Sequence, residues 1–276
     1  MIREYEGIDL AKSYDQLRPS YPGQLVEEIL AYLRKNCVYG FSKRIMLDVG
    51  CGGGKSTKIF TPYFDSILGI DISEGQIEFA KENNKADNIE YRLIEGNIFP
   101  LEDGTVDFVN CATTAHYLDL NLFESECERV LKPGGCAAVY AYAPFTIKSL
   151  ENEILAEIKQ DSVYKQVMVK FIRDCGAHEG NLAVLERYKP IYDQLKNETK
   201  QFKILESTVP YTVTNFLKLH ETVFGYSRFR GRGGKDPLTE FGISLRKLLK
   251  LQNTPDDQLK FNVVYEYPLI LFYKAK

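Results

Sequence analysis

The residues best placed for chemistry form a glycine-rich turn near residue 50. The apolar run Ile45-Met-Leu-Asp-Val49 is followed directly by Gly50-Cys-Gly-Gly-Gly-Lys-Ser56. An apolar run bounded by glycines predicts a short buried strand, and the polar residues after it can begin a helix. In α/β proteins such a unit binds a nucleotide, because glycines let the backbone approach the ligand and the helix N-terminus offers free N–H groups. The stretch therefore predicts a nucleotide-binding turn.

Three kinds of nucleotide loop compete for this turn. The P-loop requires Gly-x-x-x-x-Gly-Lys-Ser/Thr, and Gly54-Lys55-Ser56 supplies its second half, but Val49 stands at its first glycine. The dinucleotide fingerprint requires Gly-x-Gly-x-x-Gly, and its third glycine is replaced by Lys55. The spacing that is present is Asp48-x-Gly50-x-Gly52-x-Gly54.

A second acid follows at the distance that ribose recognition needs. The run Ser66-Ile-Leu-Gly-Ile-Asp71 predicts a second strand that ends in an acid 21 residues after Gly50. An α/β mononucleotide half places a carboxylate there, where it can accept both ribose hydroxyl protons. An acid at a strand end can instead cap a helix, but Ser73 is available for that task. Asp71 is therefore interpreted as the ribose ligand.

The acid and glycine spacing resembles motif I of the class I S-adenosylmethionine-dependent methyltransferases. The leader Tyr14-Asp-Gln-Leu-Arg-Pro-Ser-Tyr-Pro22 is similar to that of small-molecule enzymes related to trans-aconitate methyltransferase, and Arg129-Val-Leu-Lys-Pro-Gly-Gly135 is a further shared feature. The resemblance covers about residues 14 to 143. It implies S-adenosylmethionine as cofactor, S-adenosylhomocysteine as product, and no metal. The cofactor contacts that it implies are Tyr14, Asp48, Gly50, Cys51, Gly52, Asp71, Ile72, Asn97, Ile98 and Cys111.

Two features at the adenine end depart from that family. Gly96-Asn97-Ile98 stands where the family has Gly-Asp-Ala, so Asn97 replaces the acid that accepts from the adenine amino group. An amide oxygen can accept the same proton without charge assistance, although an Asn can also cap a turn. The loop that follows is also two residues shorter than the family's usual spacing.

The acceptor is less well defined by the sequence. Base-amino methyltransferases carry Asn/Asp-Pro-Pro-Tyr/Phe after the fourth strand, whereas this chain has Asn110-Cys-Ala-Thr-Thr-Ala-His116, which disfavours an amide or base nitrogen. His116 is a candidate general base or pocket wall, and otherwise a structural histidine. Arg18 is a candidate clamp for a carboxylate, and Tyr21 is suited to face the sulfonium. Tyr117 and Tyr142 are further candidate substrate contacts.

Four cations lie in the run Arg228-Phe-Arg-Gly-Arg-Gly-Gly-Lys235. Such a run is usually a solvated turn. The functional alternative is an anion clamp in which Arg228 and Arg230 grip a substrate carboxylate, because guanidinium groups bind carboxylates with two hydrogen bonds. The run is too short, and the chain too acidic, to predict nucleic-acid binding.

Composition narrows the partners. The 276 residues carry a net charge of −3, so the chain has no overall positive electrostatic potential that would attract nucleic acid or an anionic membrane. No apolar run reaches ~18 residues, so no membrane-spanning helix is expected, and the N-terminus does not resemble a signal peptide. Six cysteines occur without a Cys-x-x-Cys pair, which argues against structural zinc and disulfides and for a reduced, cytoplasmic protein. The sequence does not distinguish a monomer from a homodimer.

The predicted elements give an α/β fold. Residues 1–23 are expected to form an extended arm, because Pro19 and Pro22 forbid a continuous helix. Resemblance implies the class I methyltransferase (Rossmann-like) fold, a doubly wound sheet of seven strands with the last one antiparallel, and Pro268 in that strand suggests an edge or a bulge. After residue 144 the pattern predicts helices at 147–174, 182–195, 214–224 and 238–251, with a strand at 202–209 and a final strand at 261–273.

These elements suggest three parts. Residues 1–143 are expected to form the arm and the S-adenosylmethionine-binding core, and residues 144–200 a helical cap insertion. Residues 201–276 are expected to complete the core, with a second cap insertion at about 212–256.

The resulting hypothesis is an S-adenosylmethionine-dependent methyltransferase that acts on a small molecule, with a carboxylate or hydroxyl oxygen favoured as acceptor. A carboxylate needs no base, whereas a hydroxyl makes His116 the leading base. Catalysis would consist chiefly of holding acceptor, methyl group and sulfur in line. Two alternatives stay open. One is a methyltransferase-like binding or regulatory protein without turnover, which the substituted Asn97 supports. The other is a protein or RNA methyltransferase.

Overall fold

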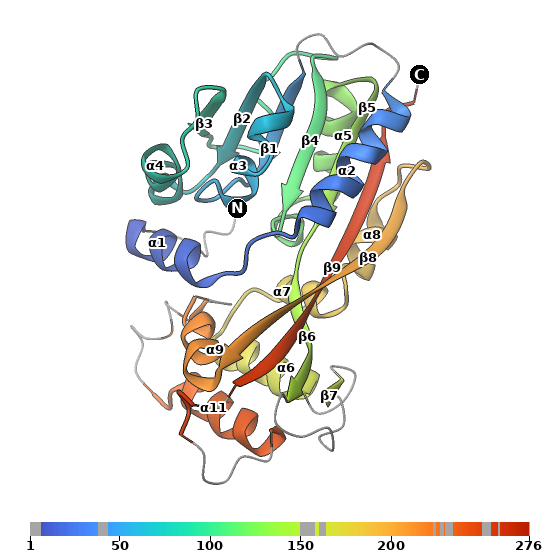
Figure 1. Cartoon of the computed structure of the whole chain (residues 1–276). Helices are drawn as coiled ribbons and strands as arrows, with labels where there is room; N and C mark the ends of the chain where they lie inside the picture. The colour runs from blue at the N-terminus through green and yellow to red at the C-terminus, as the bar shows by residue number, and fades with distance from the viewer. Residues whose placement is uncertain are drawn as a thin grey trace.

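The computed structural model describes residues 7–37, 44–149, 158–159, 164–222, 225–226, 229, 234–249, 255–258 and 260–275. Figure 1 shows a core with a central sheet and a second group of helices, here called the cap, around the far ends of the longest strands. In the part of the chain that is described, one nine-stranded sheet has the order β3-β2-β1-β4-β5-β9-β6-β7, and β8 pairs with β9.

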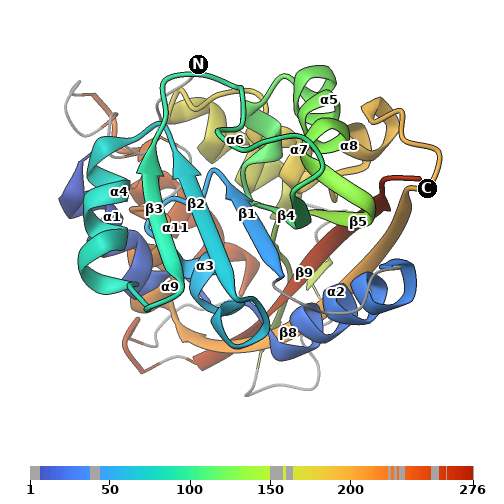
Figure 2. The same cartoon turned by 90° about the horizontal axis from the view of Figure 1, so that it is seen from above.

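The core sheet has the predicted arrangement of parallel strands followed by antiparallel ones. Every residue of β4 is buried, as are the last four of β1, which is why both strands are mostly apolar and do not alternate between apolar and polar residues. Figure 2 shows the core strands side by side, with α5 on one side of the row and α2 on the other. The five parallel strands are β1 (Ile45–Val49), β2 (Ser66–Asp71), β3 (Ile89–Leu93), β4 (Val106–Ala112) and β5 (Leu131–Tyr140).

Two long strands run through both the core and the cap. β9 (Lys260–Tyr273) pairs antiparallel with β8 (Gln201–Thr212) along nearly its whole length. On its other side β9 pairs with β5 and then with β6 (Ala143–Ser149), which follows β5 after a two-residue break. β9 is therefore a central strand, and the expectation that Pro268 marks an edge is wrong. Pro268 fits in this strand because it lies opposite the break between β5 and β6, on the side where a residue other than proline would donate its N–H. On that side the Pro268 carbonyl accepts from the N–H of Ala141.

The stretch after residue 144 is less helical than predicted. β6 and β7 (Ile158–Lys159) occupy part of the region for which no strand was expected, because β9 extends far enough to provide a partner for β6. The helix predicted at 182–195 is divided at Arg187 and Tyr188, which both have a positive φ. The cap helices are α6 (Lys165–Asp174), α7 (Asn181–Leu185), α9 (Val213–His220) and α11 (Pro237–Leu248), whereas α8 (Lys189–Gln194) lies at the core end, near α5 (Figure 2).

The N-terminal segment is not extended throughout, contrary to expectation. α1 (Ile8–Leu17) is a helix, because Pro19 and Pro22 both lie beyond its end and cannot interrupt it. Arg18 to Pro22 then forms the extended link to α2, which begins directly after Pro22. The remaining core helices are α2 (Gly23–Asn36), α3 (Lys55–Lys58), α4 (Glu74–Asn83) and α5 (Leu120–Val130), with short 3-10 turns at Thr61–Tyr63 and Ala115–Tyr117.

None of the helices in the described ranges is long and apolar enough to cross a membrane. All six cysteines carry free thiols.

Candidate active site

A cavity with about 1420 Å³ of empty space, part of it open to solvent, lies at the carboxyl ends of β1, β2 and β4. This is the edge at which doubly wound sheets bind their ligands. Its walls come from α1, the glycine turn, the start of α4, the turn after β4 and the start of α5. Of the residues predicted to contact the cofactor, those that line it are Tyr14, Gly50, Cys51, Gly52, Asp71, Ile72 and Asn97.

The glycine turn is fixed by its own backbone and by the turn after β4. Gly50, Gly52 and Gly54 have positive φ values of 66°, 52° and 85°, which residues other than glycine rarely adopt. A Cβ on Gly50 would lie only 2.2 Å from Thr114 Cγ2. Thr114 in turn donates its hydroxyl to the carbonyl oxygen of Gly50 at 3.0 Å. The two turns therefore form one floor for the cavity.

Asp48 lies beneath this floor and not in the cavity lining. Its buried carboxylate accepts hydrogen bonds from Ser56 Oγ at 3.0 Å, Thr57 Oγ1 at 2.6 Å and Asn110 Nδ2 at 2.8 Å. Burial raises the pKa of Asp48 to about 6, although these hydrogen bonds oppose the shift. Asp48 thus joins β1, α3 and β4. It supports the glycine turn from below, whereas the sequence suggested that it contacts the cofactor.

Asp71 has the geometry expected of a ribose ligand. It ends β2, lines the cavity and accepts from the N–H of Gly52 at 2.8 Å and from the N–H of Ser73 at 2.9 Å, one on each carboxylate oxygen. Asp71 therefore presents its carboxylate at the cavity, and carboxylate oxygens can accept hydrogen bonds from ribose hydroxyls. Ser73 caps α4 by accepting from Gln76 N, as expected.

The adenine end differs in part from the expectation. Asn97 lines the cavity, but Ile98 is 61% exposed and Cys111 is fully buried, and neither belongs to the lining. Apolar side chains form the wall instead, namely Ile94, Phe99, Leu118 and Phe123. Sequence reasoning missed these four because each also reads as an ordinary core residue.

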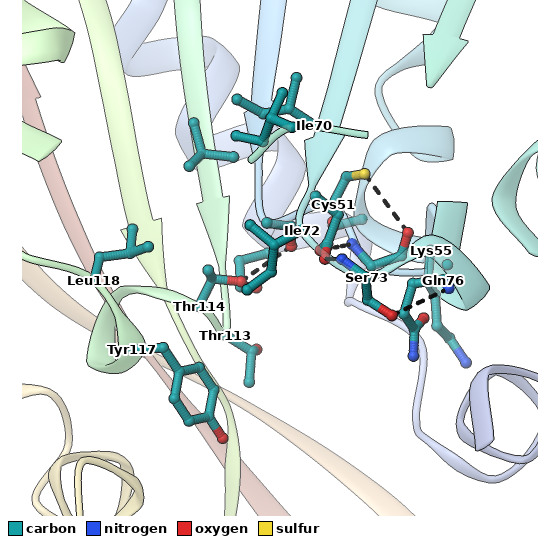
Figure 3. A pocket seen from close by; sticks show the side chains of 18 of the residues that line it. Cys51, Lys55, Ile70, Ile72, Ser73, Gln76, Thr113, Thr114, Tyr117 and Leu118 are labelled. Atoms are coloured by element: carbon teal, nitrogen blue, oxygen red, sulfur yellow. Dashed lines mark hydrogen bonds between the residues drawn. The ribbon is translucent and has the colours of Figure 1, made fainter. Parts of the chain in front are cut away.

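Tyrosines and a threonine form the end of the cavity nearest the arm and the cap. Tyr14, Tyr21, Tyr117 and Tyr142 line it, as does Thr113. The Tyr21 and Thr113 hydroxyls lie 3.2 Å apart, and the Tyr21 ring packs edge-on against Tyr142 at 5.6 Å. Figure 3 shows Thr113 and Tyr117 at the bottom of the view, at the opposite end of the drawn residues from Ile70.

Thr113 was not singled out by the sequence. It has φ 55°, a left-handed conformation that is strained for a β-branched residue. Strain of this kind accumulates at functional sites when the surroundings hold it. Here the Thr113 N–H donates to the Tyr140 carbonyl at 2.6 Å, and the neighbouring Thr114 is fixed to Gly50.

His116 is not part of the cavity lining. It is buried, and its Nδ1 shares a hydrogen bond with the Tyr188 hydroxyl at 2.7 Å. Burial, assisted by the nearby His178, lowers the pKa of His116 to about 3, so the imidazole is neutral at physiological pH. The geometry places Tyr117, and not His116, at the wall.

Arg18 lies directly behind the tyrosine wall. Its guanidinium lies 4.8 Å from the Tyr14 ring centroid and 6.0 Å from that of Tyr142. It donates to Thr222 Oγ1 at 3.1 Å and to the Thr222 carbonyl at 3.2 Å, which joins the arm to the cap. Arg228 and Arg230 lie outside the described residues, and Lys235 is exposed beside Glu240.

Comparisons with known proteins agree with this geometry. Residues 47–139 match the model of the methyltransferase domain family. A Dictyostelium discoideum protein named "Putative methyltransferase" is 26% identical over 95% of this chain and 92% of its own. A Saccharomyces cerevisiae protein named "Probable S-adenosylmethionine-dependent methyltransferase" is 28% identical over 47% of this chain and 44% of its own. A solved structure titled "Putative Type II Methyltransferase", from Anaeromyxobacter dehalogenans, superposes with a TM-score of 0.67 at 21% identity, covering 94% of this chain and 99% of that one.

Residues 47–139 therefore form a methyltransferase domain, the chain has the fold of the class I S-adenosylmethionine-dependent methyltransferases, and its cofactor is S-adenosylmethionine. The described cavity fits that cofactor, because it combines a glycine turn, an acid at the end of β2 and an apolar slot between β3 and α5.

Proposed function

We propose that this methyltransferase transfers the methyl group of S-adenosylmethionine to an oxygen of a small molecule bound in the same cavity. The observation that carries the proposal is the continuity of the cavity from the glycine turn to the hydroxyls of Tyr21 and Thr113. Gly50, Cys51 and Gly52 would hold the methionine part of the cofactor and Asp71 its ribose. Asn97 and the apolar wall would hold the adenine.

A small acceptor is supported by what surrounds the acceptor end. The wall there is built from α1, the link at Tyr21 and Tyr142 in the break between β5 and β6, and the Tyr142 ring packs on Tyr265 and Tyr267 of β9. The arm and the break between β5 and β6 thus enclose this end from two sides, which suits a metabolite better than a folded protein or an RNA.

The reaction needs little from the protein besides orientation. An acceptor oxygen forms a bond to the methyl carbon, the carbon–sulfur bond breaks, and its electron pair stays on sulfur, which loses its positive charge. Holding the three atoms in line can supply roughly 7–11 kcal/mol of the barrier. Tyr21 and Thr113 are placed to direct the acceptor with their hydroxyl groups.

A carboxylate is the acceptor that the site supports best. It is already ionised and releases no proton, whereas a hydroxyl needs a base, and His116 lies outside the lining. The cationic Arg18 behind Tyr14 and Tyr142 favours an anionic acceptor at this end. The leader's resemblance to trans-aconitate methyltransferase-like enzymes supports the same choice.

The proposal is tested with S-adenosylmethionine carrying a labelled methyl group and a fractionated metabolite extract. We expect label in small molecules, and mild alkali should release it as methanol, because esters hydrolyse where ethers and N-methyl groups do not. Label that stays in small molecules after alkali would show that the acceptor is not a carboxylate but another atom. Label found only in macromolecules, or bound cofactor without any transfer, would contradict the proposal and favour the protein, RNA or binding-protein alternatives.

A further inference from the structure

One lysine joins the glycine turn to the N-terminal arm, and the cofactor-binding pattern does not explain it. Lys55 is the first residue of α3 and belongs to the Gly54-Lys55-Ser56 run that imitates half of a P-loop. Its Nζ donates to the main-chain oxygen of Asp15 at 2.6 Å and of Arg18 at 2.7 Å. A P-loop lysine directs its ammonium at phosphates. This one is directed at the end of α1.

The two acceptors are groups that a helix end leaves without partners. α1 ends at Leu17, and the last four carbonyls of a helix have no partner within it. The same end carries partial negative charge, which an ammonium offsets. Burial lowers the pKa of Lys55, with Asp15 opposing the shift and Arg18 adding to it. A partly buried ammonium needs hydrogen-bond acceptors, so Lys55 and the closed position of α1 stabilise each other.

The backbone directly before Lys55 is held in one position. Gly54 has φ 85°, and a Cβ there would lie 2.4 Å from the Tyr91 hydroxyl, so the turn fits closely against β3. Asn84 Nδ2 donates to the Gly53 carbonyl at 2.7 Å and holds the turn from the end of α4. The position of the ammonium is therefore set by the cofactor turn.

α1 forms the wall opposite this turn. Ala11, Tyr14 and Asp15 line the cavity across from Gly50 to Gly52. In Figure 1 α1 lies beside α4, between the core and the cap. Beyond Lys55, the end of the arm is held by Arg18 on Thr222 of the cap. Movement of α1 away from α3 would open the cavity.

We propose that Lys55 is a positioning residue that holds α1 closed over the bound cofactor, and so sets how tightly the cofactor is held. Lys55 acts through α1 and not on the reacting atoms. The inference rests on the cofactor site described under the proposed function.

Titration with S-adenosylhomocysteine tests it by calorimetry on the full chain. Lys55→Met should bind roughly tenfold more weakly than the wild type. Lys55→Arg, which keeps a cation at the helix end, should recover most of the affinity. Lys58→Met is the matched control, because Lys58 lies on the same short helix with an exposed side chain. Equal affinities for Lys55→Met and Lys58→Met would overturn the proposal.

Hydrogen exchange separates this role from a general loss of stability. S-adenosylhomocysteine should slow exchange of the α1 amides in the wild type, and Lys55→Met should lose that protection while β1 and β4 keep theirs. If Lys55→Met does not fold, hydrogen exchange of the wild type alone tests the proposal. Exchange of the α1 amides that is unchanged at saturating S-adenosylhomocysteine would then overturn it. A wild type that binds no S-adenosylhomocysteine would instead refute the cofactor site itself.

Discussion

The two acids of the glycine region, Asp48 and Asp71, differ in their surroundings. Asp71 lines the cavity, whereas the Asp48 carboxylate accepts hydrogen bonds from three side chains below the floor. We infer that substitution of Asp71 acts on cofactor binding and substitution of Asp48 on stability.

The buried Asp48 predicts a specific pH dependence of stability. Burial raises its pKa from 3.8 to about 6, so the folded protein keeps a proton that the unfolded chain releases in this interval. Stability from this group is therefore highest below pH ~4 and falls as the pH rises to about 6, by about 3 kcal/mol in total. Asp48→Asn cannot titrate.

Urea unfolding of the wild type and Asp48→Asn at several pH values checks this. The free energy of unfolding of the wild type, relative to the variant, should decrease between about pH 4 and pH 6 and then stay level. A difference that is constant across that interval would mean that Asp48 is already ionised at acid pH in the folded protein.

Single residues were predictable where spacing alone determines position. The distance from Gly50 to Asp71 follows from the length of one α/β unit, and both residues reach the cavity. The placement of His116 depends on the orientation of the 3-10 turn Ala115–Tyr117, which no spacing encodes. Lys55 and Thr113 were missed as site residues because the partner of each, α1 or the arm tyrosine, comes from a distant segment.

At the scale of elements, the glycine turn and the turn after β4 work as a pair. Gly50 has a positive φ, and a Cβ added to it would collide with the Thr114 side chain. That side chain is held in place because its hydroxyl donates to the carbonyl oxygens of Gly50 and Ala112. The shape of the cofactor floor therefore depends on the absence of a side chain at Gly50.

Gly50→Ala should consequently destabilise the protein more than its backbone conformation alone explains. Gly104 is the matched control, since its φ of 65° is nearly the same as the 66° of Gly50 and a Cβ there would meet nothing within 4 Å. Gly104→Ala should cost about 1 kcal/mol, and Gly50→Ala a further 1–3 kcal/mol from overpacking. Thermal unfolding of both variants measures the difference, and equal losses would show that the contact with Thr114 relaxes freely.

Elements were predictable in the core and less so beyond it. The strand Ser66–Asp71 is a short apolar run that ends in an acid, and the helix Gly23–Asn36 repeats apolar residues at helical spacing directly after Pro22. The errors at β6 and in the arm have different causes. β6 is a strand because β9 provides its partner from more than 100 residues away. α1 is a helix because its ten residues contain no proline, and Pro19 and Pro22 restrict only the backbone that follows it.

At the scale of the whole molecule, the cap is an extension of the core sheet. β8 and β9 pass through both parts, and Arg187 of the cap forms an ion pair with Glu266 of β9, with Nε to Oε2 at 2.5 Å. The side chain of Glu266 is 11% exposed and lies across from Glu206 on β8. We infer that core and cap unfold together.

Arg187→Met should destabilise both parts at once, by about 2–4 kcal/mol, because it leaves the buried Glu266 carboxylate beside another acid. Lys189→Met is the control, since Lys189 forms a mostly exposed pair with Asp193 and should change stability by less than about 1 kcal/mol. Urea unfolding followed by far-ultraviolet circular dichroism and by tyrosine fluorescence provides the measurement. Two separate transitions in the wild type would contradict a shared sheet.

The central claim is that the cavity at the ends of β1, β2 and β4 binds S-adenosylmethionine through the glycine turn and Asp71. Calorimetric titration with S-adenosylhomocysteine tests it most directly, with Asp71→Ala and the exposed Asp87→Ala compared at equal concentrations. We predict one bound ligand per chain in the wild type and in Asp87→Ala, and about a hundredfold weaker binding in Asp71→Ala, because two charge-assisted hydrogen bonds to the ribose are lost. Absence of binding in the wild type, or equal affinity in Asp71→Ala, would contradict the claim.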